Sequence, residues 1–227
     1  MSLSNNAGPR MRRSATATIA ALAFILSGIA ASGGPFEDGS NAYRCRDYSA
    51  AMQYWRPLAD QGNAEAQVAV GRLYDFGFGV PQSYASAATW FAKAAEQGNP
   101  EGEFLLGSLY ELGQGVKQDY GKAAELYKKA ADQGEVFAES KIGVFYFRGL
   151  GVTQNYPQAV IWLRKAAEHG EAMAQSTLSL MYALGVGVPK DMVEADKWRQ
   201  RLAGEAQQAA HPPVSRVPVS EGCERKP

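Results

Sequence analysis

Glycines recur every 36 residues through most of this 227-residue chain. Gly62, Gly98, Gly134 and Gly170 mark the period, and no insertion interrupts it. Three further columns keep the same register: Tyr74, Tyr110, Tyr146 and Tyr182; Gly71, Gly107, Gly143 and Ser179; and the doublets Gly77/Gly79, Gly113/Gly115, Gly149/Gly151 and Gly185/Gly187. A period of this length indicates a two-helix unit stacked into an α-solenoid, a fold that presents a long surface to other molecules.

Each unit is expected to hold two helices joined by the glycine doublet. In the second unit, Asn99 and Pro100 start the first helix (helix A) as a capping residue and a first-turn proline, and Gly113 ends it. The second helix (helix B) starts after a short polar residue, a favoured N-cap, and ends at the single glycine. The N-cap column is Asp47, Ser83, Asp119, Asn155 and Asp191.

Several columns resemble the Sel1-like repeat family, which is related to tetratricopeptide repeats. They are Ala66, Val70-Gly71, Tyr74, Gly77-x-Gly79-Val80, Tyr84, Ala87, Trp90, Ala94-Ala95 and Gly98. The resemblance covers units 63–98, 99–134, 135–170 and 171–206, and residues 43–62 look like an N-terminal half repeat that has helix B alone. It implies a right-handed, all-α solenoid that acts as an adaptor for protein partners and has no general catalytic property.

The N-terminus indicates a cleaved secretory signal peptide over residues 1–31. Three arginines, Arg10, Arg12 and Arg13, precede an apolar run from Ile19 to Ala30 that ends in small residues. The alternative is a membrane anchor, but roughly a dozen apolar residues are fewer than the ~20 that span a bilayer. Met11 is an alternative start to Met1. We therefore expect a periplasmic or secreted protein with no stable membrane span after cleavage.

The remaining ends of the chain are expected to be irregular. Residues 32–42 would form a linker, and the prolines near the C-terminus predict a disordered tail over 207–227. Two cysteines remain after cleavage, Cys45 and Cys223, one near each end of the chain. An oxidising compartment permits a disulfide between them. The alternative is two free or intermolecular thiols.

Composition and charge argue against several classes of function. Acidic and basic residues balance at 23 each, and no Lys/Arg-rich run is present, so nucleic-acid binding has no electrostatic basis. The two histidines, His169 and His211, are not near a cysteine in the chain, so no nucleophile or metal site is indicated. The Gly-x-Gly loops follow a helix, whereas phosphate-binding loops follow a strand. We expect no enzyme activity, cofactor or metal.

A partner is expected to bind the face of helix A opposite its buried stripe. In the first full unit that face carries Glu65, Val68, Arg72 and Asp75. The matching positions are Glu101, Phe104, Ser108 and Glu111, then Phe137, Ser140, Val144 and Phe147, then Met173, Ser176, Leu180 and Ala183. The face becomes apolar along its length, which exposed positions seldom are without a partner. The predicted partner-binding residues are Phe104, Phe137, Val144, Phe147, Met173 and Leu180.

Three occupants are consistent with these residues: a peptide or protein partner, the chain's own Val/Pro tail, and homodimerisation or ordinary packing between repeats. Paired carboxylates hydrolyse glycans, but a shallow groove seldom desolvates such a pair. We therefore expect a non-catalytic protein-interaction scaffold of the bacterial cell envelope. The alternatives are a secreted host-interaction factor and a hydrolase that acts on a cell-wall component.

Overall fold

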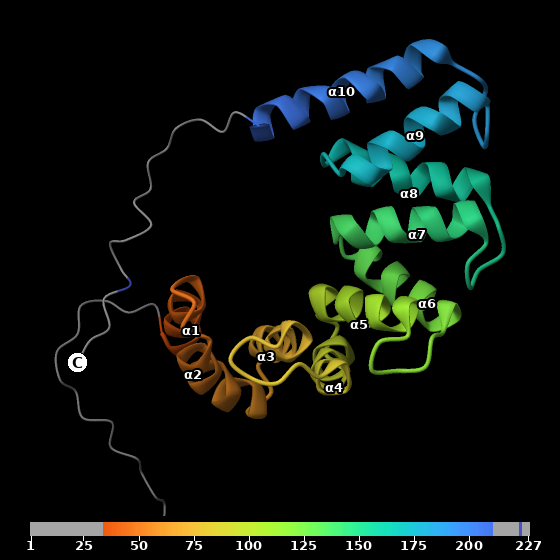
Figure 1. Ribbon diagram of the computed structural model, residues 1–227. Helices are drawn as coiled ribbons and strands as arrows, with labels where there is room; N and C mark the ends of the chain where they lie inside the picture. Colours follow the sequence, from red (N-terminus) through yellow and green to blue (C-terminus); the bar gives the residue numbers. More distant parts are fainter. Residues whose placement is uncertain (1–33, 211–222, 224–227) are drawn as a thin grey trace, which may run out of the picture. The chain divides into compact units, whose positions relative to one another are not determined.

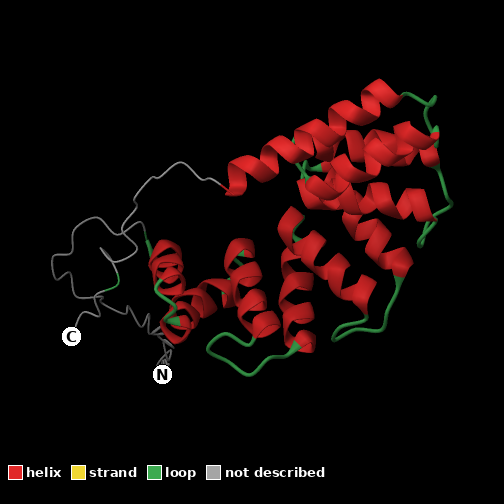
Figure 2. Ribbon diagram, turned by 45° about the horizontal axis from the view of Figure 1, so that its top comes forward, coloured by secondary structure: helices red, strands yellow, loops and turns green. Residues whose placement is uncertain are grey.

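The computed structural model describes residues 34–210 and Cys223, with side chains over 34–204 and at Cys223. These residues form ten helices and no strand (Figures 1 and 2). The helices are α1 (Pro35–Arg44), α2 (Tyr48–Asp60), α3 (Ala64–Phe76), α4 (Tyr84–Glu96), α5 (Pro100–Leu112), α6 (Tyr120–Asp132), α7 (Val136–Arg148), α8 (Tyr156–Glu168), α9 (Ala172–Leu184) and α10 (Met192–Ala210). Each helix packs against the next one in the chain. The predicted all-α solenoid is confirmed, and the predicted signal peptide, residues 1–31, lies outside the described residues.

The predicted caps delimit the helices. The Ser83 and Asp119 side chains accept hydrogen bonds from the amides of Ser86 and Lys122 at 3.2 and 3.0 Å. The other members of the N-cap column, Asp47, Asn155 and Asp191, make the same bond. The first glycine of each doublet ends helix A in the left-handed region, with φ between 68° and 73°. Each N-cap bond stabilises its helix by about 1 kcal/mol.

The second glycine of each doublet joins one repeat to the preceding one. A Cβ at Gly79 or Gly187 would lie 2.9 or 2.7 Å from atoms of Tyr48 or Tyr156, in the first turn of a helix B one repeat earlier. Gly115 and Gly151 approach Tyr84 and Tyr120 still more closely. Each glycine loop therefore packs against the start of helix B in the preceding repeat. Any side chain at the second glycine would push the two repeats apart.

A third glycine column lets the two helices of one repeat approach each other. A Cβ at Gly71 would lie 2.5 Å from the Phe91 ring. In the last repeat Ser179 takes this position, and its hydroxyl donates to the Ala195 carbonyl at 2.9 Å. Serine fits because the residue matching Phe91 is the exposed Arg199, so no ring competes for the space.

The expected linker at 32–42 is wrong, because residues 35–44 form helix α1. This helix is the helix A that the predicted half repeat lacked, and Phe36 and Tyr43 pack it against the core around Trp55. Gly39 approaches the Trp55 ring as Gly71 approaches Phe91. The loop from α1 to α2 has only three residues, against seven between α3 and α4. The shorter loop shifts α1 out of the 36-residue register and so hides it in the sequence.

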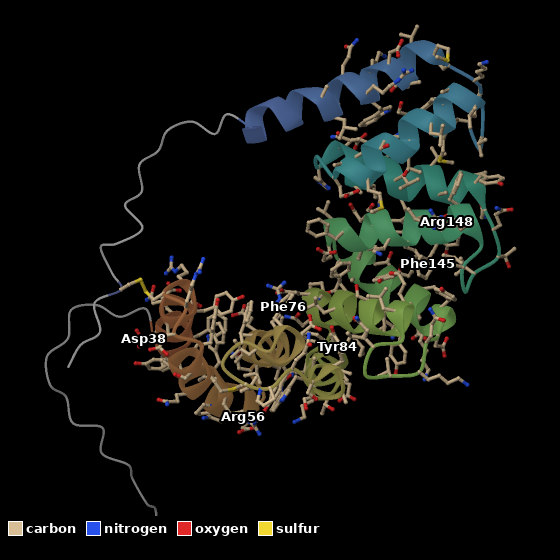
Figure 3. The ribbon with its side chains drawn as sticks, in the orientation of Figure 1. Asp38, Arg56, Phe76, Tyr84, Phe145 and Arg148 are labelled. Carbon is tan, nitrogen blue, oxygen red and sulfur yellow. A yellow bond between two sulfur atoms is a disulfide. The ribbon has the colours of Figure 1, made fainter. Side chains whose placement is uncertain are left out.

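The C-terminal end also differs from expectation. Helix α10 continues to Ala210, so residues 207–210, assigned to the tail, are helical. The segment after Trp198 is rich in Ala, Gln and Arg, which favour helix, and the first strong helix breaker is Pro212. Cys223 forms a disulfide with Cys45, which resolves the open alternative in favour of a bridge (Figure 3). The rest of the predicted tail, 211–222 and 224–227, lies outside the described residues.

A buried polar residue occupies the same position of helix A in all four full repeats: Gln67, Glu103, Glu139 and Gln175, each at most 4% exposed. Gln67 and Gln175 donate their amide hydrogens to a carbonyl of the preceding helix B, at 3.1 and 3.2 Å. A carboxylate has no hydrogen for such a bond. Glu103 and Glu139 therefore cannot donate the hydrogen bond that the two glutamines make to helix B. Burial raises the pKa of Glu103, and the positive charge of Lys129 and a hydrogen bond from Gln133 offset this effect only in part.

Replacing Glu103 by glutamine should stabilise the protein at neutral pH by about 1 kcal/mol, because the amide keeps the Gln133 bond and is not desolvated as an ion. The Glu103 pKa is raised in the folded state, so its favourable contribution is present below the unfolded pKa and is lost as pH rises through the folded pKa. The gain in Glu103→Gln should therefore grow as pH rises from about 4 to 7. Urea unfolding at several pH values measures it.

The reverse change, Gln67→Glu, is the matched control, because Gln67 is as buried and accepts from Gln97 at 2.8 Å. The Gln67→Glu variant should be less stable than wild type at pH 7 and should regain that stability at acid pH. Equal stability of Glu103→Gln and wild type at every pH would contradict this account of the column.

Candidate functional site

Between successive repeats each helix B packs against the next helix A, and among like helices those of the A layer approach each other most. Helix α3 contacts α5, and α7 contacts α9, across the repeat boundary. Where stacked units tilt toward each other, their nearest elements lie on the inner side of the curve. The predicted face of helix A is therefore the concave face of the described helices.

The six predicted residues, which we call the apolar patch, all lie on this layer, on α5, α7 and α9. Phe137, Met173 and Leu180 are 59%, 52% and 52% exposed. Phe104, Val144 and Phe147 are half-buried and pack against the core clusters. Packing between repeats, one of the alternatives weighed above, therefore accounts for part of the burial of these three. The exposed three remain available to a partner.

Aromatic contacts hold the patch in place. The Phe104 ring lies 6.1 Å from the Phe137 ring on the next A helix and 5.7 Å from the buried Tyr127 ring. Phe147 lies 5.5 Å from Tyr156. Ring pairs at these separations add roughly 0.5–1.5 kcal/mol beyond simple burial. The three phenylalanines of the patch are thus preorganised, which lowers the entropy lost when a partner binds.

Two other positions of the predicted face are not available to a partner. Val68 and Ser140 are each only 3% exposed, although helical spacing places them opposite the buried stripe. The neighbouring repeat covers them: Val68 belongs to a core cluster with Leu106 and Leu109, and Ser140 donates to Glu171 at 2.7 Å. The binding face is therefore narrower than the sequence pattern indicates.

A polar cluster borders the patch between α5, α6 and α7. The Tyr127 hydroxyl donates to Glu111 at 2.5 Å and lies 3.1 Å from the Ser108 hydroxyl. Lys141 approaches the two Glu111 oxygens at 2.9 and 3.1 Å. Burial, followed by the bond to Glu111, raises the pKa of Tyr127 well above its usual range. The tyrosine stays neutral, and the cluster offers one matched ion pair beside the apolar side chains.

The first half of the concave face is charged, as the sequence predicts, but it also includes residues that sequence reasoning missed. A hollow of about 730 Å³ lies over α3 and takes walls from α1 and α5. Phe36, Tyr43 and Arg44 of α1 line it together with Glu65 and Arg72. Gly39 is the signal that could have revealed α1. It lets helix A approach helix B as Gly71 does, but it lies four positions away from the 36-residue register.

The titratable groups on this face are mostly engaged within the protein. The acids of this face are Glu65, Asp75, Glu101 and Glu111, and of these Glu101 pairs with Arg72 at 2.5 Å and Glu111 with Lys141. The exposed His169 lies with Nδ1 3.5 Å from the buried Glu139 carboxylate, at the end of α8. Among the described side chains, no group of His, Cys, Asp and Glu has an arrangement suited to a metal ion. None of the described helices has the length and apolar character needed to cross a bilayer.

Comparisons with known proteins agree with the repeat pattern. The family model for the Sel1 repeat matches residues 36–63, 64–99, 100–135, 136–171 and 172–203, and the first match includes α1. No curated protein matches the chain.

Twenty-eight solved chains are similar to this one, and two of them illustrate the likeness. One is c5321, described as a protective antigen present in uropathogenic Escherichia coli strains and displaying an SLR fold; it is 34% identical, with a TM-score of 0.71, over 76% of this chain. The present chain spans only 38% of that antigen's length. The other is a Sel1 repeat protein from Oxalobacter formigenes, 38% identical with a TM-score of 0.69 over 74% of this chain and 69% of its own length. The chain therefore belongs to the Sel1 repeat family.

Proposed function

We propose that this chain is a non-catalytic scaffold of the bacterial cell envelope that binds a peptide or protein partner through the apolar patch. Proteins with Sel1 repeats generally mediate protein–protein interactions. The single observation that carries the proposal is the exposure of Phe137, Met173 and Leu180, all above 50%, on the concave layer. Exposed apolar side chains that gather on one face usually mark an interaction site.

Two observations support export. The N-terminal sequence has the charge and apolar pattern of a secretory signal, and Cys45 is bonded to Cys223. Disulfides form and persist in oxidising compartments such as the periplasm. The similarity to a protein described as a protective antigen favours a second candidate, a secreted factor that contacts host molecules.

The proposal is tested by changing Phe137, Met173 and Leu180 together to serine. Truncating an anchor in an interface typically costs about 2 kcal/mol of binding, so the triple variant should lose at least 100-fold in affinity for its partner. Because the three side chains are more than half exposed, the variant should melt close to wild type. Quantitative mass spectrometry of envelope proteins captured by the two baits identifies the partner, and titration measures the affinity ratio.

The matched control removes the same number of exposed apolar side chains from the B helices, at Tyr54, Ile161 and Val193, which are 44%, 49% and 68% exposed. It should capture the partner at wild-type level. Equal capture by wild type and the patch variant, with loss in the control, would move the binding face to the B layer. A collapsed melting curve of the patch variant would show that these residues stabilise the fold instead.

A further inference from the structure

We propose that the hollow between α1, α3 and α5 is a second binding site, for a peptide segment of a protein partner that carries a lysine or arginine next to apolar side chains. None of the residues that line this hollow belongs to the apolar patch. The two sites lie at different ends of the concave layer, and this proposal does not depend on the first.

The size and walls of the hollow fit a short piece of peptide. Its volume of about 730 Å³ falls in the range of known ligand pockets. Apolar surface comes from Phe36, Tyr43 and Trp55 on one side and from Ala69 and Pro100 on the others. Charged side chains surround these groups, so the site has an apolar wall within a polar rim.

The charges of the lining leave one negative group unmatched. Arg44 pairs with Glu37 at 3.0 Å, and Arg72 pairs with Glu101 at 2.5 Å. Both arginines that line the hollow are therefore neutralised by its own carboxylates. The fifth charge is Glu65, which is exposed and makes no ion pair among the described residues. A bound cation would complete the electrostatic match.

The aromatic wall favours the same class of ligand. The Phe36 and Tyr43 rings lie 6.0 and 5.7 Å from the Trp55 ring, whose Nε1 donates to the Phe36 carbonyl at 3.1 Å. Both rings are half-buried and held in place, and the negative face of a ring attracts a cation.

The protein already uses this interaction on its B helices. Lysine nitrogens lie 4.0 Å from the centre of the Trp90 ring and 4.2 Å from that of Trp162. No lysine or arginine of the described chain covers Phe36 or Tyr43 in this way. An ammonium or guanidinium group from a partner would therefore meet Glu65 and aromatic rings that no cation of the described chain contacts.

The experiment uses N-acetylated tripeptide amides and the full, oxidised chain. Leu-Lys-Phe is the cationic probe, and the same tripeptide with norleucine in place of lysine is the neutral probe of similar shape. Titration followed by two-dimensional amide NMR should show at least 10-fold tighter binding of the lysine probe. The shifts should fall on Tyr43, Glu65, Ala69 and their neighbours. Raising the salt from 50 to 500 mM should weaken the lysine probe only.

Glu65→Gln should weaken the lysine probe about 5-fold and leave the norleucine probe unchanged. Glu96→Gln, the same change at an exposed position of α4, should alter neither. The triple variant of the apolar patch should bind the probe as wild type does, so this site and the proposed function succeed or fail separately.

Equal binding of the two probes, or shifts located elsewhere, would overturn the proposal. Binding that appears only after reduction of the Cys45–Cys223 bond would also overturn it. That result would mean that the bond holds the protein's own chain over the hollow, since Cys45 adjoins the lining residue Arg44.

Discussion

Replacing Gly151 by alanine should destabilise the protein by about 4 kcal/mol, enough to break the array between its second and third repeats. Gly151 has φ 65°, where an L side chain costs roughly 1–2 kcal/mol. The added Cβ would also lie far inside van der Waals contact of the Tyr120 carbonyl oxygen and of the Gly121 amide. Overpacking of this kind typically costs a further 1–3 kcal/mol, and backbone atoms yield less than a side-chain end. Urea unfolding followed by circular dichroism measures the loss.

Gly134→Ala is the matched control. Gly134 has a larger positive φ, 85°, but nothing lies within 4 Å of its added Cβ. Only the cost of an L side chain in the left-handed backbone conformation remains, so Gly134→Ala should lower the free energy of unfolding by about 1 kcal/mol. If both variants lose the same amount, the glycine loop does not seat on α6, and the account of how repeats are joined is wrong.

Reduction of the Cys45–Cys223 bond should lower the melting midpoint by on the order of 10 °C. The bond joins residues 178 positions apart, so it strongly restricts the unfolded chain. Closing a loop of this length is worth about 5 kcal/mol in the chain-entropy model, and in a domain of this size each kcal/mol shifts the midpoint by roughly 2–4 °C. Thermal melts with and without dithiothreitol make the comparison.

The double variant Cys45→Ser and Cys223→Ser should melt with the reduced wild type and should not respond to dithiothreitol. If the oxidised and reduced proteins melt together while mass spectrometry confirms the bond, the bridge contributes nothing to stability. Its role would then be limited to holding Cys223 near the end of α1.

The repeat architecture was predictable because each of its signals acts locally. A glycine in the left-handed region ends helix A, and a short polar side chain caps helix B, whatever the neighbouring repeats do. The structure shows these features in every full repeat. Helix α1 was not predictable from the period, since a loop four residues shorter moves Gly39 out of register with Gly71.

The sequence predicts which side of helix A forms the binding face, but not which residues on that side are exposed. Helical spacing says which way a side chain points, but it does not say how closely the next repeat approaches. Val68 and Ser140 point away from the buried stripe and are nevertheless covered, whereas Phe137 at a neighbouring position is not. The disulfide was undecidable for a similar reason, because the path of the chain beyond the repeats sets the distance between its two cysteines.

The seating of each glycine loop on the preceding helix B bears on how such a chain can evolve. The four contacts join residues that are 31 positions apart in every case, from Gly79 and Tyr48 to Gly187 and Tyr156. A gene duplication of 36 codons therefore recreates every boundary contact, wherever in the unit the duplication begins. An insertion between the two residues of a contact changes their separation unless its length is a multiple of 36 residues. Chains of this kind can change in length by whole repeats without new compensating mutations, and the length of the concave face changes with them.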